Sequence, residues 1–169
     1  MSIRHYRYCP QCSRELDPGI DGGTPYKVCR PCDVRFYDEP KVAVVAMILD
    51  ADSVLLVKRL NDPEAGSWCL PGGFMNVAET PQAAVTREVA EECGLTVTDL
   101  KLLGVFPMVG DGRTTGVVIA YAAVPADPSQ PPRAGDDADE VRWFKRGHLP
   151  SPMAFETNRH LLRDWNGAY

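Results

Sequence analysis

The chain has 169 residues, of which 44% are hydrophobic and 24% charged, and its formal net charge is −5. This composition is typical of a soluble globular protein, and the length suffices for one ordinary domain with a small appendage. The longest apolar run, residues 42–49, is too short to span a membrane, and the N-terminus lacks the apolar core of a signal peptide. We therefore expect a cytoplasmic protein, whose acidity disfavours general attraction to nucleic acid.

Residues 1–39 contain two Cys-x-x-Cys pairs separated by sixteen residues, which are Cys9, Cys12, Cys29 and Cys32. That spacing is typical of a tetrahedral Zn²⁺ site, and four thiolates leave no open position for catalysis. Two disulfides are the alternative, which requires a secreted protein. The segment shows no sustained apolar periodicity, so we predict a small zinc ribbon whose folding depends on one structural ion.

The ribbon segment carries no excess of basic charge. Residues 1–40 contain six Lys and Arg residues and six Asp and Glu residues, so their sum is zero. This balance argues against nucleic-acid binding and favours a structural role or a dimer contact. Cys69 and Cys93, the two remaining cysteines, are interpreted as small buried hydrophobic residues.

From residue 40 to residue 169 the pattern predicts a single α/β domain. Strands are expected at 42–49, 54–59, 100–106, 117–124 and 140–144, with helices at 81–93 and 153–165. The helices should cover the two faces of the sheet. Residues 124–139 are predicted to form a flexible loop.

The first helix has clear end signals. Thr80 is a good N-cap, Pro81 suits the first helical position and Gly94 suits a left-handed C-cap. Within this helix Val85, Val89 and Cys93 form an apolar stripe at intervals of four residues.

A neighbouring face of this helix carries three carboxylates, from Glu88, Glu91 and Glu92. Like charges this close repel each other, so a compensating positive charge is expected. Oxygen ligands favour hard cations such as Mg²⁺, although a solvated charged face is the usual reading of such a cluster. The preceding Leu70-Pro-Gly-Gly-Phe74 loop favours the metal, because its glycines permit close approach to the helix and their carbonyls can join the ligand shell.

Residues 73–95 match the Nudix signature GX5EX7REUXEEXGU at every fixed position, with Val89 and Leu95 at the aliphatic sites. The box and the ribbon together resemble the zinc-ribbon branch of the Nudix hydrolases, which includes enzymes of the NADH, ADP-ribose and FAD pyrophosphatase types. The resemblance implies an α/β/α sandwich with a mixed sheet. It also implies hydrolysis of a nucleoside diphosphate linked to another group (NDP-X), giving a nucleoside monophosphate and phosphorylated X.

The resemblance also implies roles for particular residues. Two or more Mg²⁺ or Mn²⁺ ions would be bound by the box glutamates and the Gly73 carbonyl, with Glu88 acting as a ligand or as the base that orients water. An ion pair between Glu79 and Arg87 would brace the loop. The residues assigned to this catalytic machinery are Glu79, Arg87, Glu88, Glu91 and Glu92.

A second acidic cluster lies late in the chain, at residues 136, 137, 139 and 140. Many Nudix enzymes take a further metal ligand or the base from a corresponding loop, so Asp137 and Glu140 are candidates. The alternative is a solvated acidic loop.

The substrate is less constrained by the sequence. NADH pyrophosphatases carry SQPWPFPxS downstream of the box, whereas this chain reads GVFPMVGDGRTTG at 104–116. Enzymes for ADP-ribose or dinucleoside polyphosphates are associated with a proline or a tyrosine further downstream, and Pro107 comes too early to match it. The C-terminal segment LPSPMAFETNRHLLRDW, residues 149–165, is similar to that of ribbon-bearing family members of the ADP-ribose and FAD pyrophosphatase types. Candidate substrate contacts, each with a core or solvent-exposed alternative, are Trp68, Phe74, Phe106, Arg113 and Phe155.

Other functions remain open at this point. One is a housecleaning nucleoside triphosphate pyrophosphohydrolase, or an isomerase of prenyl diphosphates on the same fold. Another is a non-catalytic nucleotide sensor whose ribbon contacts nucleic acid or protein, although sensors commonly have eroded boxes. Capped RNA is a further substrate class in the family, and a homodimer is expected by analogy with ribbon-bearing relatives.

Overall fold

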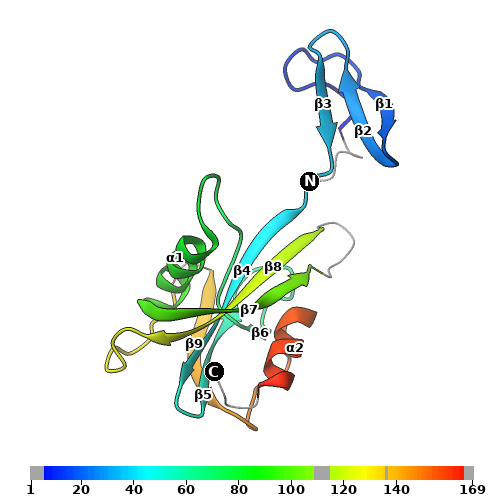
Figure 1. The fold of residues 1–169 in the computed structure, drawn as a ribbon. Helices are drawn as coiled ribbons and strands as arrows, with labels where there is room; N and C mark the ends of the chain where they lie inside the picture. Colours follow the sequence, from blue (N-terminus) through cyan, green and yellow to red (C-terminus); the bar gives the residue numbers. More distant parts are fainter. Residues whose placement is uncertain (1–5, 109–114, 136, 166–169) are drawn as a thin grey trace.

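Figure 1 shows a small sheet joined by a short connection to a larger sheet with helices packed on it. The computed structural model describes residues 6–108, 115–135 and 137–165. The small sheet is antiparallel, with strand order β1-β2-β3, and consists of β1 (Asp17–Asp21), β2 (Thr24–Cys29) and β3 (Val34–Tyr37). Residues 38–40 connect β3 to the larger sheet.

The larger sheet is mixed, as predicted, and it has six strands, of which the two-residue strand at Trp68–Cys69 was not expected. The order is β6-β5-β4-β8-β7, and β9 pairs with the other edge of β5. Strands β4 and β8 run parallel, whereas the other pairs are antiparallel. The strands are β4 (Lys41–Asp50), β5 (Ser53–Arg59), β6 (Trp68–Cys69), β7 (Val97–Pro107), β8 (Gly116–Pro125) and β9 (Ala138–Lys145).

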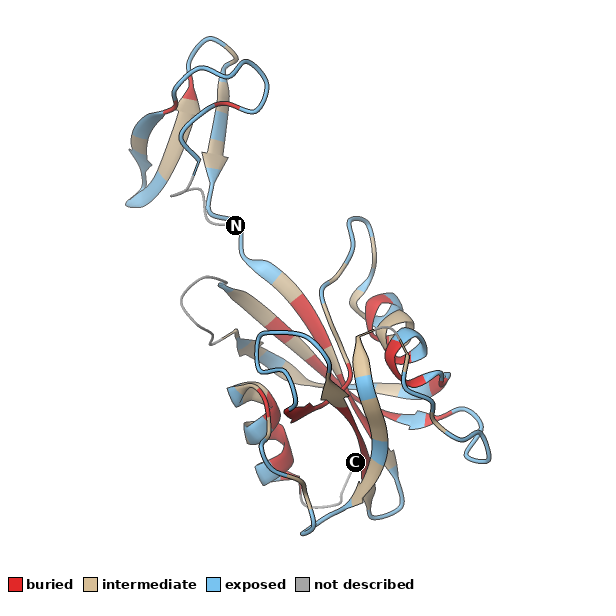
Figure 2. Cartoon of the chain, turned by 180° about the vertical axis from the view of Figure 1, so that it is seen from behind, coloured by how far each residue is buried: buried red, intermediate tan, exposed pale blue. Residues whose placement is uncertain are grey.

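The helices α1 (Pro81–Cys93) and α2 (Glu156–Asp164) cover opposite faces of this sheet. The α1 face contains Val85, Val89 and Cys93, all fully buried against residues such as Val44 and Leu55. The α2 face contains Leu161, Leu162 and Trp165, packed against Met47, Val54 and Leu56. Figure 2 shows the buried positions on the inner sides of both helices. The predicted α/β/α sandwich and apolar stripe are confirmed.

A glycine loop lies where β4 and β5 separate. These strands pair only at their hairpin end, and beyond it the loop occupies the edge of β4. The Val44 amide donates to the Gly73 carbonyl at 2.9 Å, and the Ala46 amide donates to the Pro71 carbonyl at 2.8 Å. Gly72 has φ +151°, and a Cβ there would lie 2.1 Å from the Val44 carbonyl oxygen. Only glycine allows this approach, which fixes the loop beside α1.

Helix α1 is capped at both ends. Thr80 Oγ1 accepts from the Ala83 amide at 3.2 Å, and Gly94 adopts the left-handed conformation, as predicted. The 130–135 segment then supplies donors to the C-terminal carbonyls of the helix. These bonds are Gln130 Nε2 to Gly94 O at 2.6 Å, Arg133 N to Cys93 O at 2.8 Å and Gly135 N to Glu92 O at 3.2 Å.

These bonds correct the prediction of a flexible loop at 124–139. The last carbonyls of a helix have no partner within it, and this loop satisfies them, so its path is tied to α1. A side chain at position 135 would collide with the Glu91 carbonyl, since its Cβ would lie 2.6 Å away. The loop therefore delivers Asp137 to the end of α1.

The second helix differs from its prediction at the N-terminal end. It begins at Glu156 rather than Met153, because Met153 forms a bridge with Trp68 and Phe155 has φ 58°, which no helix accepts. The ribbon hairpin was also not anticipated, although Gly22 and Gly23, both with positive φ, suit its two-residue turn. Neither helix in the described parts of the chain has the length and apolarity needed to cross a membrane.

Candidate active site

The three box glutamates differ in exposure along α1. Glu92 is 6% exposed, and the side chains of Glu88 and Glu91 are 13% and 43% exposed. Glu88 and Glu92 therefore point toward the glycine loop, whereas Glu91 lies at the edge of the site. This arrangement places two carboxylates in a partly desolvated position, where their charge needs compensation.

Arg87 connects the loop to the helix. Its Nε and Nη2 donate to both oxygens of Glu79 at 2.9 and 3.0 Å, a bidentate pair. Its Nη1 donates to Glu88 and Glu91 at 2.8 Å each, and Nη2 also donates to the Phe74 carbonyl at 3.1 Å. The expected contact between Glu79 and Arg87 is therefore present, and it requires the loop to fold back on the helix.

The Arg87 hydrogen bonds, with one from the Asn76 amide, lower the pKa of Glu79 from 4.5 to about 2. A depressed pKa adds stability above 4.5 that is lost as pH falls through about 2. We therefore predict that Glu79→Gln lowers the chemical denaturation midpoint at neutral pH but not near pH 2. Glu15→Gln, which breaks an exposed pair with Arg7, is the control and should have little effect at either pH. Equal destabilisation of Glu79→Gln at both pH values would contradict this prediction.

The glycine loop contacts both inward glutamates. The Gly72 amide donates to Glu92 Oε2 at 2.9 Å. A Cβ at Gly73 would lie 2.6 Å from Glu88 Oε2, so glycine leaves the space that this carboxylate occupies. The Gly73 carbonyl already accepts one bond, from the Val44 amide, and a carbonyl oxygen has a second lone pair for another partner.

Burial dominates the electrostatics of the two inward glutamates. Burial raises the pKa of Glu92 from 4.5 to about 8, although the hydrogen bond from the Gly72 amide acts to lower it. Nearby Asp137 and Glu88 also contribute to the increase. Burial also raises the pKa of Glu88, although Arg87 opposes the shift. Asp137 thus lies beside Glu92, close enough to share a hydrogen bond with it.

The late carboxylates separate into two groups. Asp137 reaches the box, because the loop bonded to α1 ends there. Glu140 instead pairs with Arg142, whose guanidinium lies 5.8 Å from the rings of Trp68 and Phe144 on the α2 face. The structure therefore brings Asp137 to the box glutamates and places Glu140 on the opposite face of the sheet.

The charge balance of this site favours a bound cation. Five carboxylates meet there, with Arg87 between them: Glu79, Glu88, Glu91, Glu92 and Asp137. Among the described residues, the ligand atoms of these carboxylates are not all within 4.8 Å of one another, unlike those of the cysteine cluster. Mg²⁺ completes its shell with waters and substrate oxygens, so a looser set of carboxylates fits it.

The four cysteines of the ribbon form the tightest potential ligand set in the described parts of the chain. Their Sγ atoms all lie within 4.8 Å of one another, and Cys12 and Cys29 are 3.5 Å apart. Tetrahedral Zn–S bonds place sulfurs about 3.8 Å apart, which agrees with this spacing. Burial raises the Cys9 pKa, but bonds from the backbone of Gln11 and Cys12 outweigh it and bring the pKa to about 7. A thiol with that pKa is readily deprotonated for metal binding.

Two of the candidate substrate contacts lie on the α1 side. Phe74 is 53% exposed on the glycine loop, and Phe155 packs against the α1-face core. Phe74 is next to the box, because its carbonyl accepts a bond from Arg87, whereas Phe155 is half-buried on the same side of the sheet.

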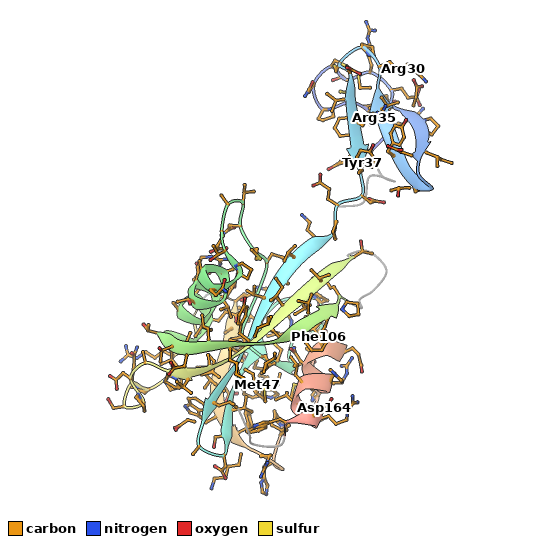
Figure 3. All side chains as sticks on the ribbon, viewed as in Figure 1. Arg30, Arg35, Tyr37, Met47, Phe106 and Asp164 are labelled. Carbon is orange, nitrogen blue, oxygen red and sulfur yellow. The ribbon has the colours of Figure 1, made fainter. Side chains whose placement is uncertain are left out.

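Two other candidates lie on the α2 side. Trp68 is buried edge-to-face against Phe144, and Phe106 contacts His160 beside a cavity of about 250 Å³ between β7 and α2. Figure 3 shows Phe106 on β7, with Asp164 of the same cavity lining on α2. The structure does not bring them to the box glutamates. Arg113 lies outside the described residues.

Sequence reasoning missed Arg59. It ends β5 on the α1 side of the sheet, and its guanidinium lies 4.9 Å from the Phe155 ring centroid. The alternation of β5 could have indicated its face, because Leu55 and Val57 share it, but nothing local in the sequence links it to the glutamates.

A family model described as NUDIX domain matches residues 39–165, so the chain belongs to the Nudix family. Its similarity to named enzymes places it with the hydrolases of that family. An ADP-ribose pyrophosphatase of Methanocaldococcus jannaschii is 37% identical over 131 residues, covering 78% of this chain and 76% of its own length.

Two further relatives extend over the ribbon. An NAD-capped RNA hydrolase NudC of Deinococcus radiodurans is 28% identical and covers 95% of this chain, which spans only 57% of that relative. The crystal structure of a Nudix hydrolase from Nitrosomonas europaea is 28% identical, with a TM-score of 0.78, covering 94% of this chain and 92% of the other. Both matches therefore span the ribbon segment as well as the Nudix domain of this chain.

Proposed function

We propose that the protein hydrolyses the diphosphate linkage of an NDP-X compound, with ADP-ribose as the first substrate to test. The observation that carries this proposal is that Glu92 is buried beside Glu88 and Asp137. Among the described residues, Glu92 itself forms no ion pair with a cation. A buried carboxylate cluster of this kind matches divalent ions and the phosphates they hold. The ADP-ribose pyrophosphatase named above supports this substrate.

Glu88, Glu91 and Glu92 are proposed to hold Mg²⁺ or Mn²⁺ with Asp137 and the Gly73 carbonyl. The ions, when bound, neutralise diphosphate oxygens and activate water for attack at phosphorus. The protein's own residues position these groups. Arg87 holds Glu88 and Glu91 in place, and the Gly72 amide fixes Glu92.

A single Zn²⁺ ion is proposed for the ribbon, bound by Cys9, Cys12, Cys29 and Cys32. All four positions of the ion are then filled by thiolates, which gives it a structural role. Residues 1–39 would be the ribbon and residues 40–169 the hydrolase domain. A homodimer and the absence of nucleic-acid partners remain predictions.

A second candidate substrate is the NAD cap of RNA, or a free dinucleotide such as NADH or FAD. The relatives named as NAD-capped RNA hydrolases match through both the ribbon and the hydrolase domain, which favours this candidate. Both substrates present the same diphosphate to the same carboxylates. Product analysis with ADP-ribose and NAD in parallel separates the two candidates.

The two late carboxylates offer a direct test of the site. Asp137→Asn should lower kcat by about 10-fold to 100-fold, because it removes a charge beside Glu92. Glu140→Gln should retain activity within about twofold, since Glu140 pairs with Arg142 on the other face. Steady-state rates for ADP-ribose with Mg²⁺ make the comparison. The reverse order of effects would refute the assignment of Asp137.

A further inference from the structure

Arg59 is held in a fixed orientation at the end of β5. Its Nε donates to the Pro63 carbonyl at 2.7 Å, and its Nη2 donates to the Asn61 carbonyl at 3.3 Å. The Phe155 ring lies against the guanidinium, with 4.9 Å from Cζ to the ring centroid. Backbone carbonyls and a ring therefore fix this cation, which lowers the entropy cost of using it to bind a ligand.

Arg59 lies close to the carboxylate cluster but is not neutralised by it. Among the described residues, no ion pair joins Arg59 to a carboxylate. In the pairing of β5 with β9, Arg59 is the partner of Ala138, the residue that follows Asp137. The next residue, Leu60, donates its amide to the Asp137 carbonyl at 2.9 Å. The end of β5 that carries Arg59 thus lies beside Asp137 of the acidic cluster.

Phe155 adopts a strained backbone conformation. Its φ is 58° and its ψ 136°, a region that a bulky residue rarely occupies. Its amide points to Glu64, whose Oε1 lies 3.5 Å away in the loop that also provides the carbonyls for Arg59. Strain of this kind persists where surrounding contacts enforce it. In this backbone conformation, the Phe155 ring lies against Arg59.

We propose that Arg59 is a substrate-binding residue that contacts a phosphate oxygen of the nucleoside diphosphate, and that Phe155 is a positioning residue that orients its guanidinium. This inference rests on the proposed function and names a residue of the same site. Guanidinium groups bind phosphate oxygens through paired N–H donors, and Arg59 keeps donors that the two loop carbonyls do not use. A diphosphate held by metal at the glutamates would then be bound by a cation at its other side.

The test compares Arg59→Gln with Arg142→Gln, which removes a cation that also lies near aromatic rings but on the α2 face. The probe is α,β-methylene-ADP with Mg²⁺, whose Kd is measured by calorimetry. KM and kcat for ADP-ribose are measured beside it. Arg59→Gln should raise Kd and KM by about 10-fold to 100-fold and change kcat much less, whereas Arg142→Gln should leave both near wild type.

Two further variants test the role of Phe155. Phe155→Leu should raise KM with a smaller effect on kcat. Phe155→Tyr, which retains an aromatic ring, should keep KM near the wild-type value. An unchanged Kd and KM in Arg59→Gln would overturn the inference, as would an equal loss in Arg142→Gln or no binding of the analogue by wild-type protein. Arg59-dependent binding of the analogue without hydrolysis of ADP-ribose would support the inference and contradict the proposed function instead.

Discussion

Glu92→Gln is expected to reduce the turnover of ADP-ribose by at least about 10³-fold, because loss of a metal-binding carboxylate removes several kcal/mol of transition-state stabilisation. Glutamine has the same shape, and its amide oxygen can still accept the bond from Gly72 that Glu92 accepts now. The fold should therefore survive. Steady-state kinetics at matched Mg²⁺ concentration measure the loss.

Stability provides an independent readout of the same change. Burial raises the pKa of Glu92 from 4.5 to about 8, so the metal-free wild type should lose stability as pH rises through that interval. Glu92→Gln has no proton to lose there, and its stability should depend less on pH. Glu156→Gln, on the exposed side of α2, is the matched control for kinetics. Wild-type turnover by Glu92→Gln would remove Glu92 from the catalytic site.

Cys29→Ser should abolish zinc binding and unfold the ribbon within the full-length chain. Among residues 6–39, which the structure describes, the apolar core of the ribbon contains only Cys9, Leu16 and Cys29, with Cys32 and Phe36 packed against them. This is too little burial for the ribbon to fold without a metal. Structural zinc supplies about 10–16 kcal/mol in small sites of this kind. Metal analysis should show about one zinc per wild-type chain and almost none in the variant.

Limited proteolysis of the Cys29→Ser protein locates the damage. New cleavage is expected within β1, β2 and β3, whereas β4 to α2 should stay resistant, because they have their own two cores. Cys69→Ala, which changes a buried cysteine outside the ribbon, should retain zinc. Full zinc content and protease resistance in Cys29→Ser would show that the ribbon does not need this ion.

The parts of the fold that local chemistry determines were predictable. Thr80, Gly94 and the stripe of Val85, Val89 and Cys93 define α1 without reference to the rest of the chain, and the structure places them as expected. The contact of Glu79 with Arg87 was expected only from the family resemblance. Its cause is the path of the glycine loop, which close packing of Gly72 on β4 determines.

Features that depend on long-range packing could not be predicted. The sequence did not separate Asp137 from Glu140, because the difference arises when the 130–135 segment bonds to the end of α1. Trp68 and Phe106 were candidates for substrate contact, yet strand register places both on the α2 face. Arg59 was missed for the same reason, since only the folded chain brings it beside Ala138 and Phe155.

The most direct test of the central claim is mass-spectrometric analysis of the products formed from ADP-ribose by zinc-loaded protein, with and without Mg²⁺ or Mn²⁺. The carboxylate cluster of Glu88, Glu92 and Asp137 predicts AMP and ribose 5-phosphate, formed only when the divalent ion is present. The same measurement with NAD and FAD determines which NDP-X compound is preferred. Folded protein that releases no phosphomonoester from any of these compounds in the presence of metal would contradict the proposed function.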